Sequence, residues 1–209
     1  MADTIPTIET RKDRLRQTML AARKAVSDPA LDAGIAQHAI ALLTELLGDW
    51  PQDAPPPVIA GYWPIKGEAD PGSIMTALNA TGQRVALPVV LSLDVPLVFR
   101  QWTPDMVLET GRLNILVPPE TAPQLEPDIL LVPLVAFDPR GYRLGMGGGF
   151  YDRTIAALKA SKSIVTIGLA YTAQAVDELP VDQFDQCLDW IITEQEAMSM
   201  PTRYAVPSV

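Results

Sequence analysis

A glycine-rich segment flanked by charged residues carries the clearest chemical signal in this 209-residue sequence. Residues 143–153 read Arg-Leu-Gly-Met-Gly-Gly-Gly-Phe-Tyr-Asp-Arg. Glycines let the backbone approach a ligand closely, and the free amides at a following helix start favour an anion. Arg143 and Arg153 can each contact phosphate oxygens, and Asp152 can hold a hard cation such as Mg²⁺ beside them. The segment therefore predicts a phosphate-binding loop with an adjacent metal ligand.

The glycine segment does not match the common nucleotide-binding loops. No Gly-Lys-Ser/Thr follows it, as a Walker A loop requires, and Phe150 occupies the last glycine position of the dinucleotide fingerprint. The alternative is a turn that only reverses the chain. A turn needs one or two glycines, whereas this segment has four with arginines and an aspartate beside them.

Positive charge is concentrated at the N-terminus. Six of the sixteen basic residues lie within the first 24 positions of a chain whose net charge is −9. Lys12 and Arg16 are four residues apart, so on a helix they share a face from which both can reach one polyphosphate. The alternative is a basic helix face that is simply solvated.

Residues 59–71 are the third segment of interest, a predicted strand that opens into an aromatic and polar loop. Tyr62 and Trp63 can stack on a flat heterocycle, and Glu68 can accept hydrogen bonds from its ring nitrogens. The alternative is that both aromatic side chains belong to the core and that Glu68 is a solvated loop charge.

Several classes of function are disfavoured. His38 and Cys187 are the only histidine and cysteine, so catalytic triads, disulfides and cysteine-rich zinc sites are disfavoured. The acidic net charge argues against nucleic-acid and membrane-surface partners. We expect no window to approach the ~20 apolar residues that span a bilayer, and the N-terminus lacks the apolar stretch of a secretory signal. We therefore expect a cytoplasmic protein without membrane partners.

Hydrophobic periodicity predicts N-terminal helices over residues 10–26 and 30–47, followed by a proline-rich connection. Later runs that are apolar throughout are typical of buried strands, and helical patterns lie between several of them. The predicted strands are residues 58–63, 84–88, 96–102, 129–137, 164–169 and 188–193, and the intervening helices are residues 73–80 and 151–160. We predict an α/β fold: a single three-layer α/β/α domain over residues 1–209, with N-terminal helices at 10–48, a sheet-forming core at 57–195 and a mainly parallel central sheet.

Taken together and in this order, these segments resemble the 5-formyltetrahydrofolate cyclo-ligase family, also called methenyltetrahydrofolate synthetase. The resemblance rests on Lys12-x-x-Leu-Arg16, Tyr62-Trp63-Pro64 with Glu68, residues 127–133 leading into 143–153, Gly168-Leu-Ala-Tyr171 with Gln174, and Leu179-Pro-Val181 with Asp185. It implies an enzyme that converts 5-formyltetrahydrofolate and ATP to 5,10-methenyltetrahydrofolate, ADP and phosphate with Mg²⁺. In the family's scheme the formyl oxygen attacks the γ-phosphate, and N10 then closes the ring with loss of phosphate.

The resemblance also implies residue roles. The residues implied to bind ATP are Lys12, Arg16, Arg143, Leu144, Gly145, Met146, Gly147, Gly148, Gly149, Phe150 and Tyr151. Those implied to contact the folate are Trp63, Glu68, Met146, Gly147, Gly148, Gly149 and Phe150. Asp152 and Asp185 match magnesium ligands, and the catalytic group would comprise Arg143, Tyr151 and Asp152, with Tyr151 near the formyl group.

Three departures from the family pattern are visible. Met146 stands where a tyrosine is frequent, Asn114 begins an altered loop, and Phe184 precedes Asp185 where a histidine is expected. Two other functions remain open: an ATP-dependent enzyme with another small heterocyclic acceptor, and a catalytically silent folate- or nucleotide-binding protein. We expect a monomer with small-molecule substrates only.

Overall fold

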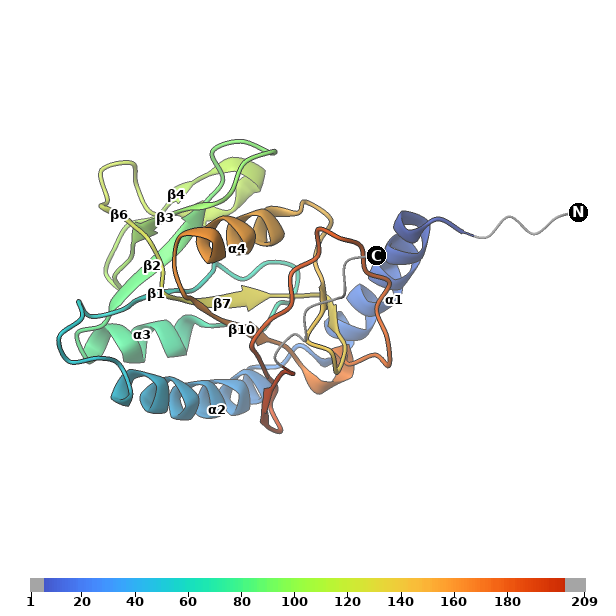
Figure 1. Cartoon of the computed structure of the whole chain (residues 1–209), viewed down its shortest axis with the longest axis horizontal. Helices are drawn as coiled ribbons and strands as arrows, with labels where there is room; N and C mark the ends of the chain where they lie inside the picture. Colours follow the sequence, from blue (N-terminus) through green and yellow to red (C-terminus); the bar gives the residue numbers. More distant parts are fainter. Residues whose placement is uncertain (1–5, 202–209) are drawn as a thin grey trace, which may run out of the picture.

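A computed structural model of the chain describes residues 6–201, which are organised around an eight-stranded sheet (Figure 1). The strand order is β12-β11-β10-β7-β1-β2-β3-β6. The five strands from β11 to β2 run parallel, whereas β12, at one edge, and β3 pair antiparallel with their neighbours. The predicted mainly parallel α/β sheet is therefore confirmed.

Strand β7 (Ile129–Pro133) lies inside the sheet and shows why the fold has three layers. Ile129 and Leu131 pack with helices α2 (Pro29–Gly48) and α3 (Gly72–Ala80) in one cluster of buried side chains. Leu130 and Val132 pack with α4 (Phe150–Ser161) in a second cluster. Successive side chains of a strand point to opposite faces, so a run that is apolar throughout needs cover on both.

Helix α1 (Ile8–Val26) lies beside this core, near one end of the sheet (Figure 1). Thr7 caps its first turn by accepting a hydrogen bond from the backbone N–H of Thr10. Its Met19 packs in a third cluster with Leu144 of the hairpin formed by β8 (Ala136–Phe137) and β9 (Arg143–Leu144). This packing places Arg16 of α1 next to the glycine segment, whose first two residues form β9.

The other strands are short. They are β1 (Val58–Ala60), β2 (Arg84–Val89), β3 (Val98–Gln101), β4 (Glu109–Thr110), β5 (Leu116–Val117), β6 (Gln124–Leu125), β10 (Val165–Leu169), β11 (Trp190–Ile192) and β12 (Ala197–Ser199). Two 3₁₀ turns, Arg112–Asn114 and Thr172–Gln174, complete the elements.

Hydrophobic periodicity placed each of the four helices no more than two residues from its observed bounds. The predicted strand over residues 129–137 proved to be two strands, because Pro133 has no N–H to continue the ladder and β8 pairs with β9 instead. The other two-residue strands, β4, β5, β6 and β9, were not predicted, since a run that short carries no periodic signal.

The expectation that no segment is long and apolar enough to span a bilayer was wrong for α2. This helix has 20 residues, and an 18-residue window reaches a mean hydropathy of 1.2, so it meets the criterion by length and composition. Its buried side chains, which are Ile35, Ala36, Ala39, Leu42 and Leu43, pack in the core on one face of the sheet. Core helices of globular proteins can meet the same criterion.

We predict that two isoleucines of α2 differ sharply in their contribution to stability. Ile35 is 1% exposed and Ile40 is 37% exposed. Ile35→Ala should lower the free energy of unfolding by about 2–5 kcal/mol, whereas Ile40→Ala should change it by less than about 1 kcal/mol. Urea denaturation measures both variants, and equal losses would show that α2 does not pack as described.

Candidate active site

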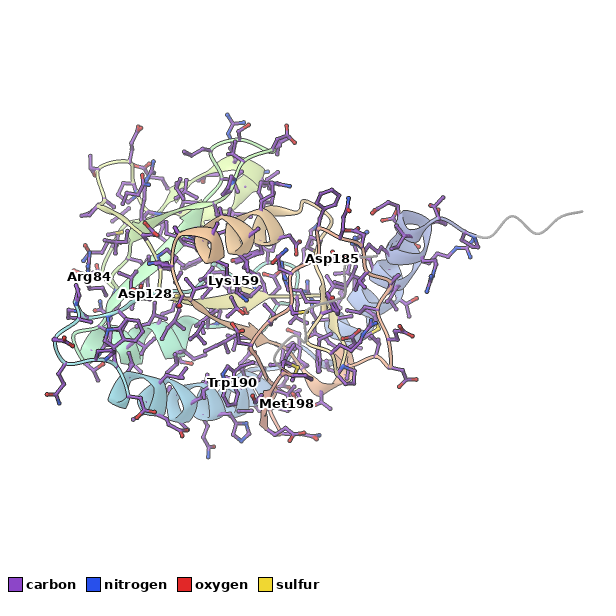
Figure 2. The ribbon with its side chains drawn as sticks, in the orientation of Figure 1. Arg84, Asp128, Lys159, Asp185, Trp190 and Met198 are labelled. Atoms are coloured by element: carbon purple, nitrogen blue, oxygen red, sulfur yellow. The ribbon has the colours of Figure 1, made fainter. Side chains whose placement is uncertain are left out.

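A cleft of about 1230 Å³ lies at the carboxyl ends of the parallel strands. Its walls come from α1, the loop after β1, the loop after β2, residues 112–115, the glycine segment with the start of α4, and residues 182–186. Figure 2 shows Asp185 on this side of the molecule, far from Arg84 at the amino end of β2. Ligand sites of open α/β sheets lie at this end of the strands.

The glycine segment forms the floor between β9 and α4. Gly147 and Gly149 have φ angles of 95° and 65°, in the left-handed region that side chains with a Cβ rarely adopt. Gly149 is the residue that precedes α4, and within residues 6–201 no side chain caps this helix start. The first amides of α4 therefore face the cleft as donors for an anion, as the residue types predicted.

Two arginines fix the shape of the glycine segment. Arg16 donates from Nε to the carbonyl of Gly145 at 2.9 Å, and it also pairs with Asp13. Arg153 donates to the carbonyls of Gly148 and Leu93 at 2.8 and 2.7 Å. The guanidinium of Arg153 thus ties the loop after β2 to the glycine segment, and its predicted contact with a phosphate stays a prediction.

Lys12 joins the first helix to residues 182–186. Its ammonium lies 2.8 Å from Asp182 and 2.7 Å from Asp185, and the side chain is 10% exposed. Burial lowers the pKa of Lys12, but the hydrogen bonds to both aspartates outweigh this effect and raise the pKa above its usual value. Lys12 is therefore a fixed positive charge in the wall of the cleft at neutral pH.

Arg143 and Asp152 form a second pair beside the first. One guanidinium nitrogen of Arg143 lies 2.9 Å from Asp152, and the other donates to the carbonyl of Gln186 at 2.8 Å. The backbone N–H of Gln186 donates in turn to Asp152 at 3.0 Å. Asp152 lies in the first turn of α4, as predicted, and these contacts bring residues 182–186 against it.

Glu68 lies in the opposite wall, on the loop after β1. Its side chain is buried, and burial raises its pKa above the usual value. Trp63 is partly buried and lines the cleft near it, as predicted. Tyr62 also borders the cleft, but it is 2% exposed and its hydroxyl donates to the carbonyl of Ala69 at 2.6 Å, so little of its ring is open to a ligand.

Tyr151 connects the two walls. Its hydroxyl is buried, and among the described residues it has no hydrogen-bond partner. Burial raises its pKa far above the usual value, the charge of Glu68 adds to this, and the charge of Arg143 opposes it. A hydroxyl with such a pKa stays protonated at neutral pH and can donate a hydrogen bond to a ligand.

The carboxylates of the cleft are suited to a magnesium ion that also binds phosphates. Within residues 6–201, no three histidine, cysteine, aspartate or glutamate side chains form a metal cage. Mg²⁺ is usually held by one or two carboxylates together with substrate phosphates and waters. Asp152 and Asp185, which both line the cleft, supply two such carboxylates.

Four groups in or behind the walls were not predicted to belong to the site. Asp182 forms an ion pair with Lys12, and the backbone N–H of Gln186 donates to Asp152. The carbonyl of Leu93 accepts a hydrogen bond from Arg153. Arg23 lies behind Glu68. Arg23 was counted with the basic residues of α1, although it is completely buried. Its position four residues after Met19 was the signal that it lies on the buried face.

A second, smaller cavity of about 320 Å³ lies at the amino ends of the strands, where Trp50, Val58, Arg84 and Asp128 are among its lining residues. None of the predicted site residues reaches it. The predicted residues thus converge on the larger cleft alone, with Arg153 in its wall in a supporting role.

Comparison with known proteins agrees with this geometry. Residues 8–194 match the model of the 5-formyltetrahydrofolate cyclo-ligase family. The chain belongs to this family. It is therefore an enzyme of the cyclo-ligase class, and the family's ligases depend on ATP.

Individual relatives cover nearly the whole chain. The 5-formyltetrahydrofolate cyclo-ligase of Haemophilus influenzae is 34% identical over 182 residues, which are 85% of this chain and 89% of the relative. That of Mycoplasma pneumoniae is 33% identical over 191 residues, 88% and 99% of the two chains. The solved 5,10-methenyltetrahydrofolate synthetase of Aquifex aeolicus superposes with a TM-score of 0.70 at 27% identity, covering 94% of this chain and 96% of its own. The solved synthetase of M. pneumoniae gives a TM-score of 0.67 at 30% identity, covering 88% and 98%.

We predict that two glycines of the cyclo-ligase cleft differ in their tolerance of a side chain. A Cβ at Gly149 would lie 2.6 Å from a guanidinium nitrogen of Arg153, whereas a Cβ at Gly145 would meet no atom within 4 Å. Because φ is also positive at Gly149, Gly149→Ala should lower the free energy of unfolding by about 1–2 kcal/mol.

Gly145→Ala is the matched control and should stay within about 0.5 kcal/mol of the unmodified protein. Urea unfolding gives the stability, and titration calorimetry with ATP reports whether the loop still binds. Equal stability of the two variants would contradict the described loop conformation.

Proposed function

We propose that this chain converts 5-formyltetrahydrofolate to 5,10-methenyltetrahydrofolate in a reaction driven by ATP. The formyl oxygen forms a bond to the γ-phosphorus, and the bond between that phosphorus and the bridging oxygen breaks to release ADP. N10 then attacks the formyl carbon, the carbon–oxygen bond breaks, and phosphate leaves with the formyl oxygen while the N10 proton is released. No histidine base is needed, because positioning and charge neutralisation assist phosphoryl transfer.

The observation that carries this proposal is one cleft with two chemically different walls. One wall has Lys12, Arg16 and Arg143 around the amides at the start of α4. The other has Trp63 and buried Glu68. The volume of about 1230 Å³ exceeds the roughly 300–1,000 Å³ of a typical single-ligand pocket, which favours two substrates side by side.

On the nucleotide side, the guanidinium of Arg16 contacts the glycine segment, and the ammonium of Lys12, on the same helix, lines the cleft beside its two aspartate partners. We assign them to the triphosphate, together with Arg143 and the amides that follow Gly149. Arg143 is held in place by the carbonyl of Gln186, so its orientation is set before a ligand enters.

Asp152 and Asp185 are the side chains that would hold Mg²⁺ in this proposal. When bound, the ion would neutralise phosphate charge and help to orient the γ-phosphate. The carboxylates and cations of this wall are already paired with one another, so a phosphate can replace a carboxylate at Lys12 or Arg143 without leaving either cation unpaired.

On the folate side, Trp63 offers an aromatic face, and Glu68 offers a carboxylate to the N–H groups of a pterin ring. Met146 and Phe150 line the same cleft as apolar contacts. Tyr151, which lies within electrostatic range of both Glu68 and Arg143, is assigned to the formyl group at the junction of the two substrates. Its protonated hydroxyl would position that group by a hydrogen bond.

We also propose that the protein acts as a monomer. The acidic net charge of −9 supports small-molecule substrates without nucleic-acid or membrane-surface partners, and the single cysteine agrees with the proposed cytoplasmic location.

We predict that the purified protein forms methenyltetrahydrofolate, followed by its near-ultraviolet absorbance, only when 5-formyltetrahydrofolate, ATP and Mg²⁺ are all present. Omission of any one should abolish the absorbance change. Product without ATP would contradict the proposed activation step. ATP hydrolysis without methenyltetrahydrofolate would point to a different heterocyclic acceptor, and folate or nucleotide binding without turnover would indicate a silent binding protein.

Asp152→Asn is the control for the role of the metal in that assay. The amide keeps the size of the side chain and can still accept the hydrogen bonds from Arg143 and Gln186. Loss of the charge should lower turnover by at least about 100-fold while the unfolding midpoint stays near that of the unmodified protein. Full turnover of this variant at saturating Mg²⁺ would remove Asp152 from the metal site.

A further inference from the structure

Arg23 is a completely buried cation that lies behind the folate wall rather than in the cleft. It is 0% exposed and sits in the last turn of α1. One terminal nitrogen donates to the carbonyl of Leu134 at 2.9 Å, and the other donates to the carbonyl of Lys66 at 3.0 Å. The nearest carboxylate is Glu68, 3.8 Å from the first of these nitrogens. A buried charge with these contacts fixes the backbone around it.

The loop segment that Arg23 contacts is a tight turn over residues 65–68. Lys66 and Gly67 have φ angles of 50° and 75°, and the N–H of Glu68 donates to the carbonyl of Ile65 at 3.0 Å. Two successive positive φ angles are typical of a type I′ turn, but a lysine in this conformation is strained. A strained backbone conformation of this kind is kept only when contacts with the surrounding structure hold it in place. The hydrogen bond from Arg23 to the carbonyl of Lys66 supplies one of those constraints.

The same turn aims the carboxylate of Glu68. One oxygen, Oε2, accepts from the N–H of Ile65 at 3.0 Å, so the side chain folds back over its own turn. The other oxygen, Oε1, is the one that faces Arg23 at 3.8 Å, which is too long for a hydrogen bond. Arg23 thus supplies positive charge to Glu68 without occupying that oxygen, which keeps it available to a ligand.

The far end of the loop is anchored independently of Arg23. Tyr62 donates to the carbonyl of Ala69, and the N–H of Asp70 donates to Asp32 of α2 at 3.1 Å. Tyr171 donates to the same oxygen of Asp32 at 2.7 Å. Loss of Arg23 should therefore release the turn over residues 65–68 while the rest of the loop stays attached.

We propose that Arg23 is a positioning residue for the folate side of the reaction, acting through Glu68 and the turn over residues 65–68. The proposal rests on the proposed function, in which Glu68 binds the pterin. Arginine suits this role because its planar fork donates in two directions at once, to Leu134 and to Lys66. A lysine keeps the positive charge but has a single nitrogen, so it cannot reproduce both contacts with the same geometry.

The experiment compares Arg23→Met, Arg23→Lys, Glu68→Gln and the double variant Arg23→Met with Glu68→Gln. Lys24→Met is the matched control, because Lys24 is the exposed neighbour of Arg23 on α1. For each protein we would measure KM for 5-formyltetrahydrofolate, KM for ATP, and the folate Kd from tryptophan fluorescence. Trp63, which lines the cleft, is the expected reporter of folate binding.

We expect Arg23→Met to raise the folate KM and Kd by about 10- to 100-fold, the range that follows from losing hydrogen bonds of a charged group. The KM for ATP should stay within about twofold, and Arg23→Lys should fall between Arg23→Met and the unmodified protein. The double variant should bind folate no more weakly than the poorer single variant, because both substitutions remove the same contact between Glu68 and the folate. Lys24→Met should match the unmodified protein.

An equal rise of both KM values, or losses that add in the double variant, would overturn the positioning role. If Arg23→Met does not fold, Arg23→Lys decides alone, and an unchanged folate Kd in that variant would count against the proposal. If the unmodified protein binds folate without forming product, the proposed function fails while the Kd series still tests Arg23. If it does not bind folate, both proposals are overturned.

Discussion

Pairs of buried cations and carboxylates hold the walls of the cleft together. Lys12 joins the first helix to Asp185 near the end of the chain, Arg143 joins β9 to Asp152 on α4, and Arg23 faces Glu68. Burying an unpaired charge costs more free energy than most single contacts contribute. Each of these charged groups therefore needs an oppositely charged partner or a backbone carbonyl beside it. The relative positions of α1, the glycine segment and residues 182–186 follow from this requirement.

The charged walls also explain how an acidic protein can bind anionic substrates. A net charge of −9 repels phosphates and folates at a distance, and salt screens most of that repulsion beyond about 10 Å. Within the cleft the local balance is different. Lys12, Arg16 and Arg143 line the cleft with the start of α4, and their low exposure strengthens their attraction for a polyphosphate.

The fold and half of the site were readable from the sequence because their signals are local. Hydrophobic periodicity predicts the helices, and uniformly apolar runs predict the buried strands. Several glycines between a strand and a helix indicate a loop that approaches a ligand closely. The folate wall was harder to predict. Tyr62 and Trp63 are adjacent residues of similar type and both border the cleft, yet Tyr62 is almost completely buried and Trp63 is only partly buried. The loop that follows them is in contact with Arg23, which lies 43 residues before Lys66 of that loop, and no local pattern in the sequence indicates that contact.

Ion-pair partners were beyond sequence reasoning for the same reason. Lys12 and Asp182 are 170 residues apart, and no periodicity joins them. The assignments of Lys12 to phosphate and of Asp185 to metal also treated the two as separate, whereas they form one salt bridge. Arg153 was assigned to phosphate from its position in the chain, and its hydrogen bond to the carbonyl of Leu93, which is 60 residues away, was not predicted.

The central claim is that both substrates occupy one cleft, so that the formyl oxygen receives the γ-phosphoryl group directly. The most direct measurement uses 5-formyltetrahydrofolate labelled with ¹⁸O in the formyl group and follows the label by mass spectrometry of the released phosphate. Phosphoryl transfer to the formyl oxygen predicts one ¹⁸O atom in each phosphate formed with methenyltetrahydrofolate. Unlabelled phosphate, with the label in water instead, would show that ATP is hydrolysed separately from ring closure and would contradict the shared cleft.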